Sequence, residues 1–228
     1  MLGIIGAMGC EVEKIVSCLD GAKETMICGQ QFWQGKLGGR DVVVARCGAG
    51  KICAAMCAAA MVIRFGVSGI INTGIAGGLD KSLRQGDFVL AEDVVQHDYD
   101  TTGVGDPIGW FSKLKTTSVS CDPVLTEKLY NSIDKGPWQI KRGRIATGDQ
   151  FIADEDKNTW IRDTFGAAAV EMEGAAIGAV CAQSGIPFAA LRCISDGADG
   201  EAPLDFPAFA RIAADRCADA VIKLMEAT

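Results

Sequence analysis

Ala169-Val170-Glu171-Met172-Glu173-Gly174-Ala175-Ala176 is an apolar, strand-like run that ends in carboxylates, and Ile194-Ser195-Asp196-Gly197 repeats this pattern further along the chain. In an extended strand, Glu171 and Glu173 point to the same side because alternate residues share a face. Ligands of open α/β sheets collect at the carboxyl ends of strands. Buried carboxylates without partners are costly, so these need either a polar ligand or structural salt bridges. This stretch alone leaves both explanations open.

Length and composition restrict the class of protein. The chain has 228 residues, enough for one large domain or two small ones. Apolar residues make up 49% and charged residues 22%, which predicts a globular protein with a substantial core. The 22 basic and 29 acidic residues give a net charge of −7, and no basic run is present. Nucleic acid is therefore not an expected partner.

Cysteine usage indicates a reducing compartment. The chain has ten cysteines, and Cys53, Cys57, Cys181 and Cys217 lie in Ala-rich helical patterns, where a free cysteine behaves as a small hydrophobic residue. No Cys-x-x-Cys pair occurs, and His97 is the single histidine, so a Cys/His metal site is not expected. We predict a cytoplasmic protein without a metal.

The chain shows no membrane or secretion signal. Its start lacks a basic segment, and acidic residues interrupt the first apolar run. The longest apolar run, 52–63, lies between Lys51 and Arg64 and is too short to cross a bilayer. It predicts a buried helix, with Lys51 exposed in the first turn.

Strand and helix patterns alternate along the whole chain without a linker or repeat. This predicts one α/β domain, residues 1–228, with a mixed sheet. Residues 25–47 suggest an antiparallel meander, 73–78 a tight glycine turn, and 99–117 a long loop that forms a lid or an interface. The predicted strands are 2–8, 25–28, 31–37, 41–47, 68–72, 86–96, 139–146, 169–171 and 187–195, and the predicted helices are 11–19, 52–63, 123–132, 154–165, 173–184 and 208–225.

Several polar or aromatic residues allow two interpretations. Glu11 is either a helix-capping carboxylate or a catalytic one. His97 and Asp98, at the end of a predicted strand, are either a general-base pair or a structural hydrogen-bonded pair. Phe151, just after a glycine turn, either stacks on a planar ligand or fills the core.

Five motifs follow one another along the chain. They are Gly6-Ala7-Met8 with Glu11, Asn72-Thr73-Gly74 with Ala76-Gly77-Gly78, Gly148-Asp149 with Phe151-Ile152, Val170-Glu171-Met172-Glu173, and Ile194-Ser195-Asp196. In order and spacing, these motifs resemble the 5′-methylthioadenosine/S-adenosylhomocysteine nucleosidases, a family of the nucleoside phosphorylase superfamily. The resemblance implies a mixed sheet that closes towards a barrel and is flanked by helices, a homodimer, and a role in methionine salvage. It implies hydrolysis of the N-glycosidic bond of an adenine nucleoside, with no cofactor.

The resemblance also implies roles for single residues. Asp196 matches the acid that protonates adenine N7, and Glu11 matches the carboxylate that helps to activate water. Phe151 matches the residue that stacks on adenine, and the backbone of Ile152 matches the group that reads the adenine edge. The other expected substrate-site residues are Met172 and Glu173 at the ribose, Arg192 near the water, Phe206 on a closing loop, and Glu171, Ser195 and Ile75 within the same motifs.

The chemistry of the reaction agrees with these roles. Cleavage at a sugar carbon passes through an oxocarbenium-like state, so an acid on the leaving side and a carboxylate on the water side are wanted. Adenine is a poor leaving anion, and protonation by Asp196 lowers the barrier, provided that burial keeps this acid protonated. Negative charge on Glu173 would stabilise the developing cation.

The sequence departs from the family pattern at two places. Ile75 stands where the family often has a serine, and 102–105 replaces a segment in which the family commonly carries an aromatic that lines the neighbouring subunit's pocket. Both departures leave the preferred 5′-substituent open, so adenosylhomocysteine, methylthioadenosine, 5′-deoxyadenosine and aminodeoxyfutalosine are all candidates.

Two other functions compete with nucleoside hydrolysis. A phosphorolytic transferase would use phosphate in place of water, but a carboxylate at Glu11 would repel phosphate. A non-catalytic nucleoside-binding module would not need the acid Asp196 opposite a water-side carboxylate.

Overall fold

The computed structural model describes residues 1–197 and 202–227, with the side chains of 202–208 excepted. The strands, in chain order, are β1 (Leu2–Gly6), β2 (Asp20–Ile27), β3 (Gln30–Leu37), β4 (Arg40–Arg46), β5 (Ile70–Gly78), β6 (Phe88–Gln96), β7 (Ser118–Ser120), β8 (Ile140–Thr147), β9 (Ala167–Glu171) and β10 (Phe188–Asp196). The helices are α1 (Gly9–Ser17), α2 (Lys51–Ala60), α3 (Pro123–Ser132), α4 (Glu155–Phe165), α5 (Gly174–Ser184) and α6 (Ala202–Ala227). A π-helical turn, η1 (Met61–Phe65), extends α2, and a 3₁₀ turn, η2 (Thr102–Val104), lies in the long loop.

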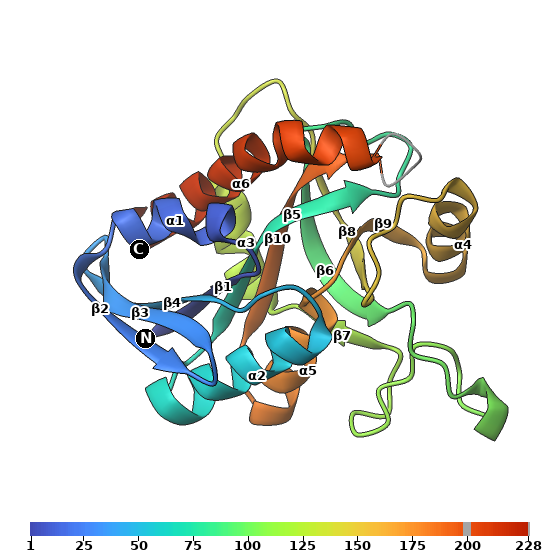
Figure 1. The fold of residues 1–228 in the computed structure, drawn as a ribbon, viewed down its shortest axis with the longest axis horizontal. Coiled ribbons are helices and arrows are strands. Elements are labelled where there is room, and N and C mark those ends of the chain that lie inside the picture. The colour runs from blue at the N-terminus through green and yellow to red at the C-terminus, as the bar shows by residue number, and fades with distance from the viewer. Residues whose placement is uncertain (198–201, 228) are drawn as a thin grey trace.

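Five strands close on themselves. The pairing order β10-β6-β8-β9-β5 is completed by a direct β10–β5 pairing, so this part of the sheet forms a small barrel (Figure 1). Its pairs are parallel between β5 and β10, β6 and β8, and β8 and β9, and antiparallel elsewhere in the ring. The prediction of a mixed sheet that closes towards a barrel is confirmed.

The sheet continues beyond the barrel as a twisted extension. β1 pairs in parallel with both β5 and β4, and β4, β3 and β2 then follow as antiparallel neighbours. The predicted meander is therefore confirmed, with short glycine turns that require positive φ at Gly29 and Gly38.

Helices cover both faces of the sheet (Figure 1). α1, α3 and α6 pack together on one face, and α2 and α5 pack together on the other. Buried aliphatic side chains fill both interfaces, including Ile5, Val43 and Ala54 on the α2 side and Ile4, Leu191 and Val221 on the α6 side. No described helix is both long and apolar enough to cross a membrane.

The helix starts follow the expected capping chemistry. Asp122 accepts a hydrogen bond from Leu125 N at 2.7 Å at the start of α3, and Asp154 accepts one from Lys157 N at 2.8 Å at the start of α4. Gly166 and Gly185 end α4 and α5 in the left-handed conformation.

The glycine-rich segment 73–78 is a strand, not the predicted turn. β5 continues to Gly78 because it pairs with β10 through the glycines and then with β9. The glycines serve close packing instead: a Cβ at Gly74 would lie 2.3 Å from Glu11 Oε1. The turn prediction for 73–78 was wrong because glycine favours turns locally, whereas here pairing with β10 and β9 keeps the segment extended.

Two helix predictions also need correction. α6 begins at Ala202, not at 208. It therefore contains Pro207, which has no backbone N–H and cannot donate a helical hydrogen bond. Residues 197–207, which the sequence predicts as a mobile acidic loop, therefore belong to α6 from Ala202 onward, and 198–201 lie outside the described residues. The run 52–63 is helical as predicted but not buried throughout, because Ile52 and Ile63 are 82% and 85% exposed. Only one face of this helix packs against the rest of the protein. Because the run is apolar on all faces, the sequence does not show which face is buried.

Candidate active site

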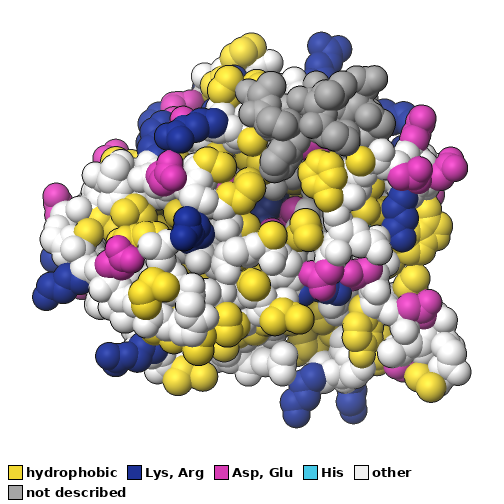
Figure 2. Space-filling view, viewed as in Figure 1, with side chains coloured by type: hydrophobic (Ala, Val, Ile, Leu, Met, Phe, Trp, Pro, Cys, Tyr) yellow, Lys and Arg dark blue, Asp and Glu magenta, His cyan; other side chains and the backbone are white. Residues whose placement is uncertain are grey.

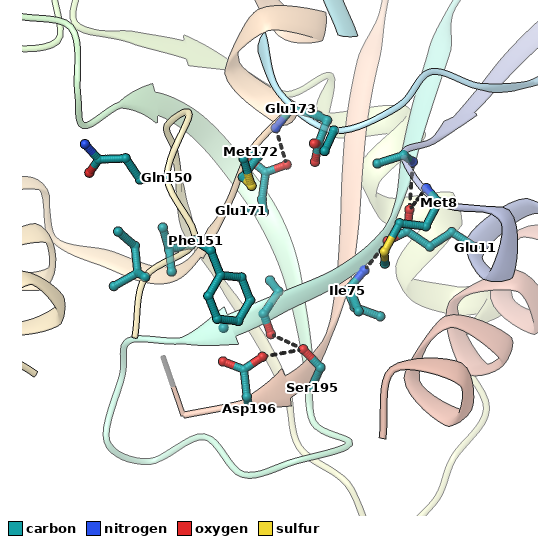
Figure 3. Close-up of a pocket in the computed structure, with 16 residues that line it drawn as sticks. Met8, Glu11, Ile75, Gln150, Phe151, Glu171, Met172, Glu173, Ser195 and Asp196 are labelled. Atoms are coloured by element: carbon teal, nitrogen blue, oxygen red, sulfur yellow. Dashed lines mark hydrogen bonds between the residues drawn. The ribbon is translucent and has the colours of Figure 1, made fainter. Parts of the chain in front are cut away.

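A cavity of about 260 Å³ opens where the ends of β1, β5, β9 and β10 meet the loop after β8 (Figure 3). Figure 2 shows a hollow at the centre of the same face, with hydrophobic side chains at its border. The sequence-predicted residues that line the cavity are Glu11, Ile75, Phe151, Ile152, Glu171, Met172, Glu173, Ser195 and Asp196. Ala7, Met8, Ala49, Ala76, Gly77, Gln150 and Val170 complete the lining.

Glu11 enters the cavity from the first turn of α1. Its carboxylate accepts hydrogen bonds from the backbone N–H groups of Ala7, Met8 and Ile75, at 2.7, 2.9 and 3.0 Å. The side chain is buried, and burial raises its pKa, although the charge of Arg192 and these hydrogen bonds act in the opposite direction. Glu11 is thus both a helix-capping group and a cavity carboxylate.

Glu171 and Glu173 differ in what holds them. β9 ends at Glu171, and Glu173 precedes α5 with φ −131° and ψ −38°, so the extended-strand argument does not apply to this pair. Glu171 accepts hydrogen bonds from the backbone N–H groups of Glu173 and Gly174, at 3.1 and 2.8 Å. Glu173 instead accepts one from Gly50 N at 2.9 Å. Burial, and then the charge of Glu171, raise the pKa of Glu173 to about 8.

Arg192 lies behind Glu171 and does not line the cavity. Its guanidinium is fully buried and hydrogen-bonds Glu171 and the side chain and carbonyl of Asn72. Its Nε has no hydrogen-bond partner among the described residues. This one cation faces the charges of Glu11, Glu171 and Glu173, which together form what we call the glutamate end of the cavity.

Ser195 and Asp196 form what we call the aspartate end, where β10 finishes. Ser195 Oγ lies 2.7 Å from Asp196 Oδ2 and 3.3 Å from the carbonyl oxygen of Ala76. Both side chains are buried. In Figure 3 the Asp196 carboxylate and the ring of Phe151 point into the same side of the cavity, and Glu11 lies across it.

Phe151 and its neighbours form an apolar wall. Phe151 is 51% exposed and lines the cavity, so it is not a core residue, whereas Ile152 is buried. Met172 lines the cavity between the two glutamates. Phe206 falls in α6, but its side chain lies outside the described part of the chain.

Comparisons with known proteins agree with this geometry. A model of the phosphorylase superfamily matches residues 1–226. A 5′-methylthioadenosine/S-adenosylhomocysteine nucleosidase of Shewanella denitrificans is 37% identical, over 98% of this chain and 98% of its own. The chain belongs to this nucleosidase family, within the phosphorylase superfamily.

Solved structures of similar proteins extend the comparison. A methylthioadenosine/adenosylhomocysteine nucleosidase from Colwellia psychrerythraea, in complex with adenine, has a TM-score of 0.92 and 38% identity, covering 98% of this chain and 93% of that one. Futalosine hydrolase of Helicobacter pylori has a TM-score of 0.94 and 31% identity, covering 100% of this chain and 97% of that one. The nucleosidase fold is therefore shared by enzymes with different names.

Near this nucleosidase cavity, the structure corrects two predictions from sequence. Lys51 is not an exposed first-turn residue: its side chain is 17% exposed, and Nζ lies 2.6 Å from Asp98 Oδ1. Asp98 is therefore bound to Lys51, and no described residue hydrogen-bonds either nitrogen of His97. His97 is buried with a lowered pKa, chiefly because of burial, and packs under Gly148, so it forms neither of the predicted pairs.

Sequence reasoning missed several residues that shape the site. Asn72 binds Arg192 from β5, and Met8 and Gln150 line the cavity. Gly50, which holds Glu173, and Asp149, which lies beside it, come from segments far apart in the chain. The one sequence signal for Asn72, Met8 and Asp149 is that they belong to the motifs shared with the family. For Gly50 the only signal is a weak one, its position just before a predicted helix.

Proposed function

We propose that this protein hydrolyses the N-glycosidic bond of 5′-substituted adenine nucleosides and releases adenine, and that residues 1–228 form one nucleosidase domain. The observation that carries the proposal is that Asp196 and Glu11, from the end of β10 and the start of α1, line one cavity. An acid and a water-side carboxylate in one cavity are what this cleavage requires. The family relationship supports the same reaction.

The aspartate end is suited to donate a proton. Ser195 Oγ can donate to Asp196 Oδ2 or to the carbonyl of Ala76, so the hydroxyl can turn to Ala76 when Asp196 carries its own proton. On substrate, Asp196 would give its proton to adenine N7 as the C1′–N bond breaks. Phe151, on the same side of the cavity, would stack on the base, and the backbone of Ile152 would read its edge.

The glutamate end is suited to water and ribose. Glu11 would accept a proton from water as the oxygen bonds C1′, so one proton enters the base and another leaves the water. Glu173, with Met172, would hold the ribose, and hydrogen bonds from sugar hydroxyls would favour the ionised form of a carboxyl that is otherwise protonated near neutral pH. Arg192, behind Glu171, would balance part of this charge from outside the cavity.

Electrostatics favour water over phosphate as the attacking group. Among the described residues that line the cavity, none is Lys or Arg. Four of them are acidic, namely Glu11, Glu171, Glu173 and Asp196. Arg192 already binds Glu171 and Asn72. Phosphate would therefore enter a site that repels it and offers no free guanidinium.

A panel of adenine nucleosides, assayed for adenine release with and without phosphate, tests the proposal. We expect phosphate-independent release of adenine and a free sugar. A requirement for phosphate, with a sugar 1-phosphate as product, would assign the protein to the phosphorolytic branch. Methylthioadenosine, adenosylhomocysteine, 5′-deoxyadenosine and aminodeoxyfutalosine belong in the panel, because Ile75 and the segment 102–105 leave the 5′-substituent open and one similar structure is a futalosine hydrolase.

We further propose that the protein is a homodimer. Ile52, Met56 and Ile63 on α2 and η1 are exposed, as is Val104 in the long loop, and hydrophobic side chains gather over α2 on the face in Figure 2. Clustered exposed apolar side chains are typical of an interface. Ile52→Glu should yield a monomer in analytical ultracentrifugation, whereas Ile212→Glu, on the exposed face of α6, should not. A monomeric wild type would disprove the dimer.

A cytoplasmic location and a role in methionine salvage complete the proposal. All ten cysteines are free thiols, and most are buried, which suits a reducing compartment. Cell fractionation, together with accumulation of methylthioadenosine in a deletion strain, would test both.

A further inference from the structure

A closed ring of hydrogen bonds joins three chain segments at the rim of the cavity. Lys51 Nζ donates to Asp98 Oδ1 at 2.6 Å, Asp149 N donates to Asp98 Oδ2 at 2.8 Å, and Lys51 N donates to Asp149 Oδ1 at 2.7 Å. Lys51 begins α2, Asp98 follows β6, and Asp149 follows β8. We call this arrangement the Lys51 ring.

Each end of the ring is continuous with a different wall of the cavity. Directly before Lys51, Gly50 N donates to Glu173 Oε1 at 2.9 Å. Directly after Asp149, the chain forms the wall that carries Gln150, Phe151 and Ile152. The ring therefore sets the spacing between the segment that holds Glu173 and the segment that carries Phe151.

The Lys51–Asp98 ion pair of the ring is shielded from solvent, whereas Asp149 is exposed. The side chains of Lys51 and Asp98 are 17% and 15% exposed, so their ion pair is less screened than a surface pair. The pKa of Asp98 is lowered: burial raises it, but the hydrogen bonds from Lys51 and from Asp149 N outweigh burial. Gln96 Oε1, 3.5 Å from Lys51 Nζ, adds a further polar neighbour.

We propose that Lys51 is a positioning residue, which holds the ribose-binding Glu173 and the base-stacking Phe151 at the spacing that one nucleoside needs. This inference rests on the proposed function, because a nucleoside spans both walls whereas free adenine reaches only the Phe151 side. Loss of the Lys51 ammonium should therefore weaken binding of the nucleoside far more than binding of adenine. Loss of a residue that merely supported the fold would weaken binding of both ligands equally.

The test compares Lys51→Met, which keeps the aliphatic stem, with Lys14→Met. Lys14 pairs with Asp219 at the same N–O distance of 2.6 Å, between α1 and α6, and neither residue lines the cavity. We expect Lys51→Met to lower kcat/KM for methylthioadenosine at least about tenfold, because small misplacements of binding groups are costly to rate. Lys14→Met should stay within about twofold, as expected for an exposed ion pair. Equal kcat/KM in Lys51→Met and the wild type would overturn the proposal.

Binding provides a second readout that does not depend on turnover. In an Asp196→Asn background, calorimetry should show that Lys51→Met raises the Kd of methylthioadenosine about tenfold and the Kd of adenine less than about twofold. Equal changes for both ligands would overturn the positioning role. If the wild type bound both ligands but released no adenine, the proposed hydrolysis would be wrong. The binding comparison would still decide the role of Lys51.

If Lys51→Met does not fold, Asp98→Asn tests the same ion pair from its other side. It retains the shape of the side chain and removes its charge, so it should reproduce the kinetic loss. The Lys51→Met/Asp98→Asn double variant should be no worse than either single variant, because both remove the same interaction. Fully additive losses would show that the two residues act separately, against the proposal.

Discussion

The two ends of the cavity hold their carboxyl groups in different ways. At the glutamate end, Glu11 accepts hydrogen bonds from three backbone N–H groups, which can only donate, and Glu171 also meets the hydroxyl of Thr147 and the guanidinium of Arg192. At the aspartate end, Asp196 meets the hydroxyl of Ser195, which can donate or accept. Fixed donors favour the ionised form of Glu11, whereas a hydroxyl can bond to either form of Asp196. In the proposed reaction, this difference would suit Asp196 as the proton donor and Glu11 as the proton acceptor.

Removing the acid should have the largest effect. Asp196→Asn keeps the shape of the aspartate end but cannot protonate adenine, so we expect kcat to fall at least about a hundredfold with normal folding. Steady-state kinetics of adenine release measures this. Asp154→Asn, which alters an aspartate that caps α4 and lies outside the cavity, is the matched control and should keep its turnover. Wild-type turnover in Asp196→Asn would remove the distinction between the two ends.

Changing the water-side carboxylate comes next. Glu11→Gln should lower kcat by about a hundredfold, because an amide is too weak a base to take a proton from water. It should also lower the free energy of unfolding by about 1–3 kcal/mol, since an amide NH₂ would face one of the N–H groups that Glu11 satisfies. Kinetics and urea denaturation separate these effects. Full turnover with weaker binding would leave Glu11 as a helix-capping residue only.

A smaller effect is expected when Glu11 is displaced instead of replaced. A Cβ at Gly74 would lie 2.3 Å from Glu11 Oε1, so Gly74→Ala must shift the carboxylate, and we expect kcat/KM to fall about tenfold. Gly78→Ala, on the same strand, would bring its Cβ only to 3.3 Å from an Ile194 side-chain atom and should change kcat/KM less than about threefold. Similar losses in both variants would show that strand packing, and not the position of Glu11, is responsible.

Glu173 should make the stability of the fold, as distinct from turnover, depend on pH. The folded-state pKa of Glu173 is raised from 4.5 to about 8, so the unfolded chain loses this proton at lower pH than the folded protein does. The stabilising contribution is therefore complete below pH 4.5, decreases as the pH rises towards 8, and is lost above it. Urea denaturation across this range should show that wild type loses stability relative to Glu173→Gln. A constant difference would mean that Glu173 keeps its ordinary acidity in the fold.

Local sequence determined a large part of the fold and the chemical type of the site. Alternation of apolar runs fixed nearly all strands and helices, and the caps at Asp122 and Asp154 were predictable because they depend on residues within a few positions. The motifs that carry Glu11, Phe151, Glu173 and Asp196 also lie at strand ends, which the sheet brings together in one cavity.

Tertiary structure decided whatever depends on partners distant in the chain. Segment 73–78 is a strand because β9 and β10 pair with it, and Arg192 lies behind Glu171 because Asn72 holds it there. Lys51, at the start of α2, is shielded because Asp98, just after β6, pairs with it. Propensity and periodicity describe only neighbours along the chain, so hydrogen bonds and ion pairs between remote segments become visible only after the chain has folded.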